Sequence, residues 1–367
     1  MPSPDKLSNY ASPSDCQLKD LDGETHISYD DMVTYENLKT AYIQSIAGKQ
    51  SRYRVQQFKK NFVTELKILY HELKTRTYIP RQSKTFNIWC TAGQKSRVIN
   101  APDFRDVIVQ RLVYNYVYYL FDRGFIFDSY GCRKEKGADR AANRTHDFIR
   151  KSSQDSYYLQ IDIHHYYYSL RKDILRQSIE RKIHDREIVN LLLTFISDVG
   201  VDVGSILAQL FGLIYLDRFD HFIKRNLKIK YYIRYVDDMV FIGLSQQECY
   251  QLLNTCISYL KDNLSLSLSK WKIQSLHHSI NFCGYRTNQA YRLIRKRSIK
   301  SFNRALSHHD FKAIESILAH SEHSASYSYQ IQKLLPLYKI LPNYLKRRTT
   351  KWLSTHTQEQ KVLLDMD

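Results

Sequence analysis

The chain has 367 residues, enough for two or three compact lobes with a substantial core. Its net charge of +18 indicates a polyanionic partner, and the 29 Tyr and 16 Phe, which can stack on bases, favour nucleic acid; a basic protein that is merely soluble is the alternative. The six cysteines form no CxxC and no paired Cys/His spacing, which argues against a zinc site and a disulfide framework.

Residues 1–30 are rich in Ser, Asp, Pro and Asn, and predict a flexible segment without order of its own. They lack the basic and apolar regions of a signal peptide. No apolar run approaches the roughly 18 residues that span a membrane. We therefore expect a cytoplasmic protein with no membrane partner. Helical patterns follow over 32–47 and 53–74 and end before Pro80.

The next stretch, FNIWCTAGQKSRVINAP (86–102), predicts two short strands joined through Ala92 and Gly93, with Lys95 and Arg97 on the return strand. A tyrosine-rich helix follows over 104–121, and its aromatic spacing is typical of a core helix. The basic, glycine-punctuated residues 129–144 then predict a loop that leads into a helix. A helix N-terminus there would suit phosphate, and a solvated loop fits the pattern equally well.

The stretch YYLQIDIHHYYYSL (157–170) begins as a strand. Because side chains alternate along a strand, Tyr158, Gln160 and Asp162 face the side opposite to Leu159 and the two isoleucines. The strand therefore directs the Asp162 carboxylate out of the sheet. Residues 200–224 predict a glycine-containing loop followed by a long helix.

In IRYVDDMVFI (233–242), two adjacent carboxylates interrupt an apolar run. The pattern predicts strand, turn and strand, with Val236, Asp237 and Asp238 at the tip. Asp-Asp offers neither the glycine nor the left-handed preference of a tight hairpin turn. Burying two carboxylates without a cation is costly, and a bound divalent metal would remove that cost. A solvated acidic turn is the alternative.

Beyond the hairpin we expect a helix over 245–262, a strand at LSLSKWKIQ (266–274), a turn at INFCGYR (280–286) and a basic helical tail containing RLIRKRSIK and LKRRTTK. The strand of Asp162 and the hairpin of Asp237 and Asp238 predict a βαβ-like core, and if the two acidic strands lie side by side the three carboxylates converge. Phosphoryl transfer through two divalent ions needs such a cluster. Two Mg²⁺ ions fit, because only hard oxygen ligands are offered.

Seven motifs in this order resemble the reverse transcriptases of bacterial retroelements over about residues 32–300, especially those of diversity-generating retroelements and of phage-defence systems. The motifs are RVINAPDFRDVIVQRL, SYGCRKEKGADRA, LQIDIHHYYYS, GSILAQLFGLIYL, YVDD, LSLSKWK and INFCGYR. The resemblance implies an α+β, right-hand polymerase. We expect fingers with the start of the palm over 31–156, a palm with an antiparallel sheet over 157–290, and a helical thumb over 291–367.

The resemblance also implies a role for individual residues. Tyr167 corresponds to the aromatic gate under the sugar, so the expected product is DNA. Lys272, or alternatively Lys270, corresponds to a lysine that protonates the leaving pyrophosphate. The remaining roles are metal binding by Asp162, Ile163, Asp237 and Asp238, nucleotide binding by Lys95, Arg97, Val203, Gly204 and Gln209, and gripping of the primer strand by Phe282, Cys283, Gly284 and Tyr285.

Two departures from the family pattern bear on function. Most relatives have Gln where this chain has Val203, and an aliphatic residue there is similar to the error-prone enzymes, so we expect low fidelity. Those enzymes carry Ser where this chain has Ala208, which favours antiphage defence over mutagenic retrohoming. The 81 residues after Arg286 leave room for a thumb but not for a nuclease or integrase domain.

The resemblance implies dNTPs, a structured non-coding RNA template and a DNA product as partners, and possible accessory proteins or a second enzyme. Priming from a nucleic acid or from a tyrosine both remain open. The main alternative is a non-catalytic, maturase-like RNA-binding module that retains the polymerase fold. An RNA-templated RNA polymerase is a further alternative, which the bulky Tyr167 disfavours.

Overall fold

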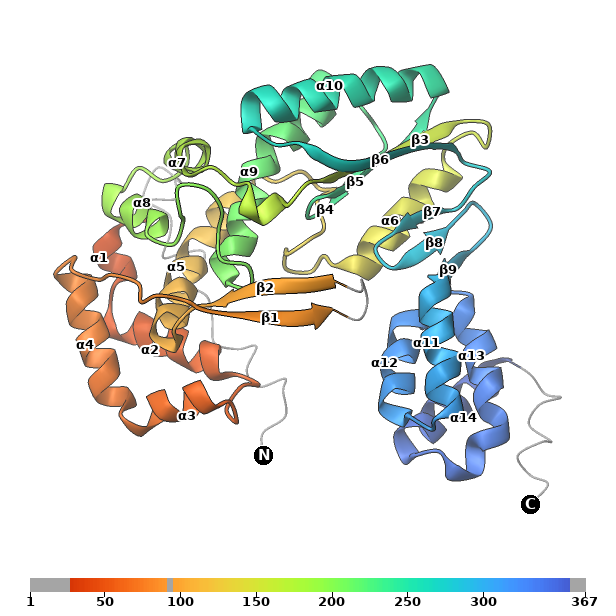
Figure 1. Ribbon diagram of the computed structural model, residues 1–367, viewed down its shortest axis with the longest axis horizontal. Helices are drawn as coiled ribbons and strands as arrows, with labels where there is room; N and C mark the ends of the chain where they lie inside the picture. Colours follow the sequence, from red (N-terminus) through yellow and green to blue (C-terminus); the bar gives the residue numbers. More distant parts are fainter. Residues whose placement is uncertain (1–26, 91–94, 357–367) are drawn as a thin grey trace. The chain divides into compact units, whose positions relative to one another are not determined.

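The computed structural model describes residues 27–90 and 95–356. The chain divides into two compact units, and each is built from separate stretches of sequence. Unit 1 comprises Met1–Arg133, Ile161–Lys230 and Leu253–Trp271, and unit 2 comprises Lys134–Gln160, Tyr231–Leu252 and Lys272–Asp367. Helices and antiparallel strand pairs occur in both units, so the expected α+β class is confirmed (Figure 1).

Unit 1 contains most of the helices of the N-terminal two thirds of the chain. Their bounds are α1 Tyr29–Met32, α2 Tyr35–Ile46, α3 Tyr53–Lys60, α4 Phe62–Lys74, α5 Phe104–Asp122, α7 Lys172–Glu180, α8 Arg186–Leu193 and α9 Ile206–His221, followed by the short helices η3 Tyr166–Tyr168 and η4 Phe222–Asn226. The helix α10, Gln246–Leu264, has residues in both units.

Two helix predictions in this region need correction. The helix expected over 53–74 is two helices, because Asn61 leaves helical geometry at φ −126° and ψ 29°. The helix expected over 32–47 is α2, preceded by the single turn α1, and Thr34 caps the N-terminus of α2 by accepting from the Asn37 amide. Residues 1–26 of the predicted flexible segment lie outside the described residues.

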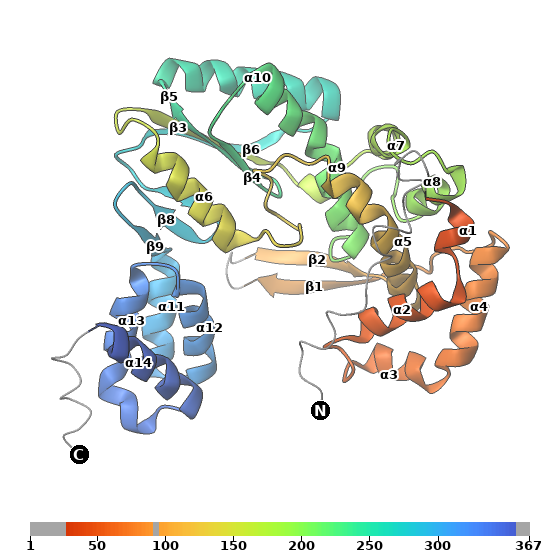
Figure 2. The same ribbon diagram turned by 180° about the vertical axis from the view of Figure 1, so that it is seen from behind.

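The core of unit 1 forms around α5, as the tyrosine-rich pattern predicts. Thirteen of its nineteen residues are buried, on all sides of the helix. It packs against both α2 and α9 (Figure 2). Since α9 is also buried around most of its circumference, these two helices form the centre of the unit.

The strands β1 (Lys84–Cys90) and β2 (Lys95–Ala101) of unit 1 form an antiparallel pair, in register from Lys84 with Ala101 to Cys90 with Lys95. This confirms the two strands expected over 86–102. The predicted link through Ala92 and Gly93 lies outside the described residues.

A four-stranded sheet has the order β4-β5-β3-β6. The strands β4 and β5 pair antiparallel within unit 2, whereas β3 and β6 have residues in both units. The bounds are β3 Tyr157–Ile163, β4 Tyr232–Tyr235, β5 Asp238–Leu244 and β6 Leu268–Ser275.

Unit 2 also contains α6 (Ala138–Arg150), a small antiparallel sheet and a helical bundle. The sheet is β7-β8-β9, with bounds Ile280–Phe282, Tyr285–Thr287 and Arg292–Ile294. The bundle comprises α11 Lys296–Ser307, α12 Phe311–Ser321, α13 Ser326–Leu334, η5 Leu335–Ile340 and α14 Asn343–His356 (Figure 1, blue). It has its own apolar core.

The bundle confirms the predicted helical tail, except that the first residues of RLIRKRSIK form strand β9. The division into fingers, palm and thumb stays a prediction. Within the ranges described, no helix is long and apolar enough to cross a membrane.

Candidate active site

In unit 1, two side chains of β6 contact the Asp162 carboxylate. Its Oδ1 accepts a hydrogen bond from the Ser269 hydroxyl at 2.8 Å, and its Oδ2 lies 3.0 Å from the Lys270 ammonium. The Asp162 side chain is 25 % exposed, whereas that of Lys270 is 75 % exposed. The carboxylate is therefore oriented by its neighbours and already interacts with a cation. The next residue, Ile163, is buried.

Three consecutive tyrosines follow Asp162 in η3, and each contacts a different element of unit 1. The buried Tyr166 donates its hydroxyl to the Gly212 carbonyl in α9. The Tyr167 carbonyl accepts from the Val201 amide at 2.9 Å. The Tyr168 hydroxyl donates to the Val98 carbonyl of β2 at 2.8 Å. Tyr167 is half-buried, the centroid of its ring lies 5.3 Å from that of Tyr166, and its carbonyl is hydrogen-bonded to the loop before α9.

The loop before α9 carries the predicted nucleotide residues Val203 and Gly204. Gly204 has φ +109°, a conformation that strongly favours glycine, and the nearest atom to a Cβ built on it is Cγ2 of Ile99, at 3.9 Å. Ser205 caps α9 by accepting from the Ala208 amide. Val203 is half-buried, and Gln209 is exposed in the first turn of α9.

Asp202 connects this loop to the β1–β2 hairpin through two hydrogen bonds. Its carboxylate accepts from the Ser83 hydroxyl at 2.6 Å and from the Asn100 amide at 2.9 Å. Lys95 and Arg97 lie on β2 opposite Cys90 and Ile88, and their side chains lie outside the described part of the structure. The hairpin that carries them is therefore joined to the loop of Gly204.

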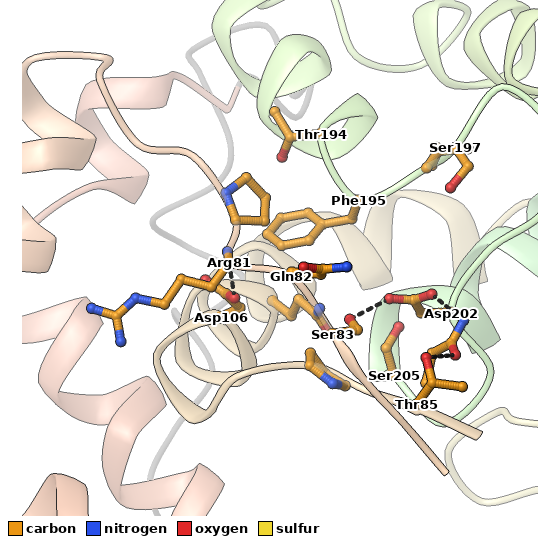
Figure 3. Close-up of a pocket in the computed structure, with 15 residues that line it drawn as sticks. Arg81, Gln82, Ser83, Thr85, Asp106, Thr194, Phe195, Ser197, Asp202 and Ser205 are labelled. Carbon is orange, nitrogen blue, oxygen red and sulfur yellow. Dashed lines mark hydrogen bonds between the residues drawn. The ribbon is translucent and has the colours of Figure 1, made fainter. Parts of the chain in front are cut away.

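A pocket of about 400 Å³ lies beside Asp202 in unit 1 (Figure 3). Most of its lining is polar, and Figure 3 shows Ser83 bonded to Asp202 and the Arg81 amide bonded to Asp106. Burial raises the pKa of the Asp106 carboxyl, although Tyr78, Arg81 and Arg105 oppose that shift. The other lining residues are Pro80, Gln82, Thr85, Asn100, Pro102, Gln110, Thr194, Phe195, Ile196, Ser197 and Ser205.

Asp237 and Asp238 belong to unit 2, where β4 and β5 meet in a two-residue turn. Tyr235 pairs with Asp238, so the turn residues are Val236 and Asp237, and Asp238 begins β5 instead of lying at the tip as predicted. Val236 has φ +59°, which is strained for a β-branched residue. The fully buried Arg234 donates to the Val236 carbonyl at 2.9 Å and so stabilises this turn.

Gln160 links Asp238 to the β7–β8 hairpin, all within unit 2. Its Nε2 lies 2.9 Å from Asp238 Oδ1 and 3.2 Å from the Asn281 carbonyl oxygen. In agreement with this proximity, burial and the Asp238 charge both raise the pKa of the Cys283 thiol. The predicted primer-grip hairpin therefore lies beside one of the predicted metal-binding carboxylates.

The β7–β8 turn consists of Cys283 and Gly284, with φ +49° and +90°. Two positive φ values in a two-residue hairpin are those of a type I′ turn. The flanking Phe282 and Tyr285 are buried, and the Tyr285 hydroxyl lies 2.5 Å from Asp139 Oδ1 and 2.6 Å from the His320 carbonyl oxygen. This hairpin is thus anchored to both α6 and α12.

The two candidate lysines of β6 have different surroundings. Lys270 pairs with Asp162 in unit 1, whereas Lys272 lies in unit 2, with its Nζ 5.7 Å from the centroid of the Tyr158 ring. The choice between them as proton donor stays a prediction.

The predicted metal-binding carboxylates come from both units. Across residues 27–90 and 95–356, no group of three or more His, Cys, Asp or Glu side chains is arranged to hold a metal ion. Asp162, Asp237 and Asp238 nevertheless offer the hard oxygen donors that Mg²⁺ prefers. Asp162 lies 3.0 Å from the Lys270 ammonium, so this carboxylate is placed to interact with a cation, and the fit to a divalent ion rests on the oxygen chemistry of the three side chains.

Several residues of these sites were not singled out from the sequence. Arg234 was missed because a cation in a strand normally indicates an exposed face. Asp202 was missed because Asp is common in loops, although its place before the Val203-Gly204 pair was a signal. The other missed residues are Ser83, Asn100, Gln160, Gly212 and Ser269.

Comparisons with known proteins indicate the same family as the motifs. A family model described as reverse transcriptase (RNA-dependent DNA polymerase) matches residues 89–287. Protein YkfC of Escherichia coli (strain K12) is 24% identical over 282 residues, which cover 64% of this chain and 72% of that protein.

Two solved structures are also similar to the chain. One is telomerase from Candida albicans in complex with the TWJ fragment of telomeric RNA, with a TM-score of 0.46, 12% identity, and coverage of 75% of this chain and 60% of that one. The other is apo telomerase from Candida tropicalis truncated from its C-terminal domain, with a TM-score of 0.42, 16% identity and coverage of 61% and 58%. The match spans less than two thirds of either telomerase chain.

Proposed function

The chain belongs to the reverse transcriptase (RNA-dependent DNA polymerase) family, and we propose that it copies a dedicated, structured non-coding RNA into DNA by two-metal nucleotidyl transfer. The observation that carries the proposal is the family match over residues 89–287, which includes Asp162 and both aspartates of YVDD. Membership of this family also implies a right-hand polymerase architecture within the α+β class.

Asp162, Asp237 and Asp238, with Ile163 beside the first, would hold two Mg²⁺ ions. When bound, such ions lower the pKa of the attacking hydroxyl and stabilise the leaving oxygen. The chain's own residues orient the ligands: Ser269 and Lys270 hold the Asp162 carboxylate, and Gln160 holds that of Asp238. Lys272, or alternatively Lys270, would donate a proton to the pyrophosphate.

The incoming dNTP would lie against residues of unit 1. Lys95 and Arg97 would clamp its triphosphate, because ammonium and guanidinium groups bind phosphate oxygens well. Tyr167 would stand under the sugar and exclude a ribose 2′-hydroxyl. Val203, Gly204 and Gln209 would border the base and sugar, and Gly204 supports this role because no Cβ projects from the loop there.

The nucleic-acid strands would contact unit 2 in two ways. Phe282, Cys283, Gly284 and Tyr285 would grip the primer strand, which the anchoring of this hairpin to α6 and α12 supports. The basic α11–α14 bundle would lie against the phosphate backbone of the duplex. Its cations and the net charge of +18 support that contact.

The proposal is tested by dNTP incorporation on an RNA template with a DNA primer and Mg²⁺. Asp237→Ala should abolish incorporation and leave RNA binding nearly unchanged, because it removes a proposed metal ligand at a half-buried turn position and no cation that could bind phosphate. Asp155→Ala, which removes a carboxylate that is 92% exposed, should change neither property and serves as the matched control.

Three results would contradict the proposal. Loss of RNA binding together with incorporation in Asp237→Ala would indicate a structural role for the turn. A wild-type protein that binds RNA but incorporates no dNTP would favour the maturase-like alternative. Faster incorporation of rNTPs than of dNTPs would instead indicate RNA synthesis.

Low fidelity is the expected consequence of Val203. An aliphatic side chain cannot hydrogen-bond to the base pair, so mispairs should be rejected less strictly. We expect Val203→Gln to lower the error rate in sequenced products at similar DNA yield. Equal error rates for the two proteins would show that Val203 does not determine fidelity.

The biological setting is either antiphage defence or a diversity-generating retroelement, and Ala208 favours defence. The two settings differ in the RNA that the enzyme copies. Sequencing the RNA and DNA that copurify with the protein distinguishes them, because mutagenic retrohoming requires a template repeat and defence does not. Mass spectrometry of the same purified material identifies any accessory protein or second enzyme that copurifies.

A further inference from the structure

Gln110 is a buried amide without a hydrogen-bond partner. It lies in the core helix α5, next to the fully buried Val109, and is only 4% exposed. In the part of the chain that the structure describes, its side chain makes no hydrogen bond. Buried polar side chains are nearly always hydrogen-bonded, because burial removes the water that would otherwise bond to them. The exception at Gln110 therefore needs an explanation.

Gln110 lines the pocket of about 400 Å³ beside Asp202, and the whole lining belongs to unit 1 (Figure 3). The pocket lies between α5, the start of β1, the end of β2 and the segment 194–205 that connects α8 to α9. Small-molecule sites usually measure roughly 300–1,000 Å³. Since the lining residues Arg81, Gln82 and Ser197 are exposed, the pocket opens to solvent. It can therefore admit one small group from outside.

The two carboxylates of the pocket wall already have partners within the protein. The Asp202 carboxylate accepts from the Ser83 hydroxyl and the Asn100 amide. The Asp106 carboxylate accepts from the Tyr78 hydroxyl at 2.6 Å. These bonds fix the wall of the pocket in the absence of any ligand, whereas the amide of α5 keeps its donors and its acceptor for a molecule in the pocket.

The charge of the wall disfavours an anion. Two carboxylates, Asp106 and Asp202, line the pocket together with a single cation, Arg81. The Arg81 guanidinium lies 3.7 Å from the Asp103 carboxylate, and Figure 3 shows its side chain directed away from Asp202. A phosphate in the pocket would thus lie near two carboxylates without a cation of its own. The pocket therefore favours an uncharged ligand.

The lining also contains apolar surface beside its polar groups. Phe195 is half-buried in the lining, which further includes Pro80 and Pro102. A flat ring with apolar faces and with donors and acceptors along its edge matches both kinds of surface. Nucleobases have this chemistry, and unpaired bases of RNA are commonly bound in pockets by stacking and by hydrogen bonds to their edges.

We propose that this pocket binds one unpaired adenine of the RNA, with the Gln110 amide bonded to the edge of the base. A primary amide places a donor and an acceptor side by side, and these match a ring nitrogen and the 6-amino group of adenine. The carboxylates of the wall add acceptors, which favour a base with an amino group over uracil. The inference rests on the proposed function only in its choice of RNA as the partner.

The test measures Kd by fluorescence anisotropy for two labelled RNA octamers. One contains only uridine, and the other has one central adenine. The wild type should bind the adenine octamer about fivefold more tightly or better. Gln110→Met, which keeps the size of the side chain and removes the amide, should bind both octamers equally. Equal Kd values in the wild type, or the same preference in Gln110→Met, would overturn the proposal.

A chemical change in the RNA tests whether the Gln110 amide reads the amino group. Replacing the adenine by purine removes only its 6-amino group. This replacement should weaken binding to the wild type about fivefold or more and leave binding to Gln110→Met unchanged. An undiminished loss in Gln110→Met would mean that the amino group is bound elsewhere. Gln57→Met, at an exposed position of α3 in the same unit, is the control and should behave as the wild type.

The Tm of the free protein separates a binding role for Gln110 from a structural one. An amide that is buried and unbonded does not stabilise the fold, so Gln110→Met should have an unchanged or higher Tm. A clear fall in Tm would show that the amide stabilises the core of unit 1, and would overturn its assignment to a ligand.

Adenosine 5′-monophosphate alone distinguishes the two sources of the base. If Gln110→Met abolished its binding in calorimetry while the octamers showed no adenine preference, the pocket would bind a free nucleotide, and the assignment to RNA would be wrong. The binding experiments do not depend on catalysis. A wild type that incorporates no dNTP but prefers the adenine octamer through Gln110 would contradict the polymerase and support the pocket.

Discussion

Gln160 joins two parts of the candidate site through one amide group. Its Nε2 donates both to Asp238 Oδ1 and to the Asn281 carbonyl of the β7–β8 hairpin. A hydrogen bond to a charged group contributes about 1.5–3 kcal/mol. Asp238 and the hairpin that is proposed to grip the primer should therefore lose their alignment when this donor is absent.

We predict that Gln160→Leu lowers kcat roughly tenfold and raises the KM for primer more than the KM for dNTP. Leucine has a similar size but cannot donate, and the hairpin contacts the primer in the proposed function. Steady-state kinetics with primer and dNTP varied separately measure both effects. Gln247→Leu, at an exposed position of α10, is the control. Equal changes in the two KM values would argue against a link through Gln160.

At the scale of single residues, the sequence indicated a functional residue where its chemistry conflicts with the local pattern, as a charged side chain does in an apolar run. Two adjacent aspartates in an apolar run of sequence are unusual enough to be identified without a structure. Arg234 is not, because its burial and its bond to the Val236 carbonyl depend on the turn that it supports. Gln160 and Ser269 are ordinary strand residues, and their roles come from partners that are distant in sequence.

The β1–β2 hairpin illustrates how an element is positioned by a few contacts. Tyr168 donates to the Val98 carbonyl, and Asp202 accepts from Ser83 and Asn100. These bonds attach the hairpin to η3 and to the loop before α9. Because Lys95 and Arg97, which are proposed to clamp the triphosphate, lie on β2, the attachment should influence nucleotide binding if that proposal holds.

We predict that Tyr168→Phe raises the KM for dNTPs about threefold to tenfold with little change in kcat, since a single neutral hydrogen bond contributes about 0.5–1.5 kcal/mol. Tm should change little, because Tyr168 is 45% exposed. Tyr291→Phe removes a hydroxyl of similar exposure, 44%, from unit 2 and is the control. An unchanged KM for dNTPs would mean that the Tyr168 bond does not position the hairpin.

The sequence predicted most elements but not all of their ends. Periodicity identified α5, α9, α10 and the paired strands, because their apolar patterns extend over many residues. It did not reveal the break at Asn61, where the apolar pattern continues through two helices. It also assigned RLI of RLIRKRSIK to a helix, although pairing with β8 makes it a strand.

At the scale of the whole molecule, the order of motifs predicted the family and the α+β class. It did not predict that the chain enters unit 1 three times and unit 2 three times. The reason is physical: unit membership depends on contacts between distant segments, and local periodicity contains no information about them. The motifs identified Asp162 and the Asp237–Asp238 pair together. The residues that contact each carboxylate lie in its own unit, and the motifs did not predict them.

The net charge of +18 predicts RNA binding that weakens strongly with salt. One groove suited to phosphate lies on the bundle of unit 2, where Lys346, Arg347 and Lys351 of α14 line a cavity of about 560 Å³ next to Tyr338. Each cation that neutralises a phosphate contributes about 0.7–0.9 to the slope of log Kd against log salt concentration. Replacing all three by Gln should therefore lower the slope by about 2 to 3.

Kd measured by filter binding at several salt concentrations between about 50 and 200 mM tests this prediction. A triple variant of the exposed Lys59, Lys60 and Lys67, in α3 and α4, removes the same charge from unit 1 and is the matched control. If RNA contacts the bundle through this groove, the α14 variant should lose more slope than the control. Equal losses would mean that total charge, and not this surface, determines binding, and an unchanged slope would exclude the groove from the RNA interface.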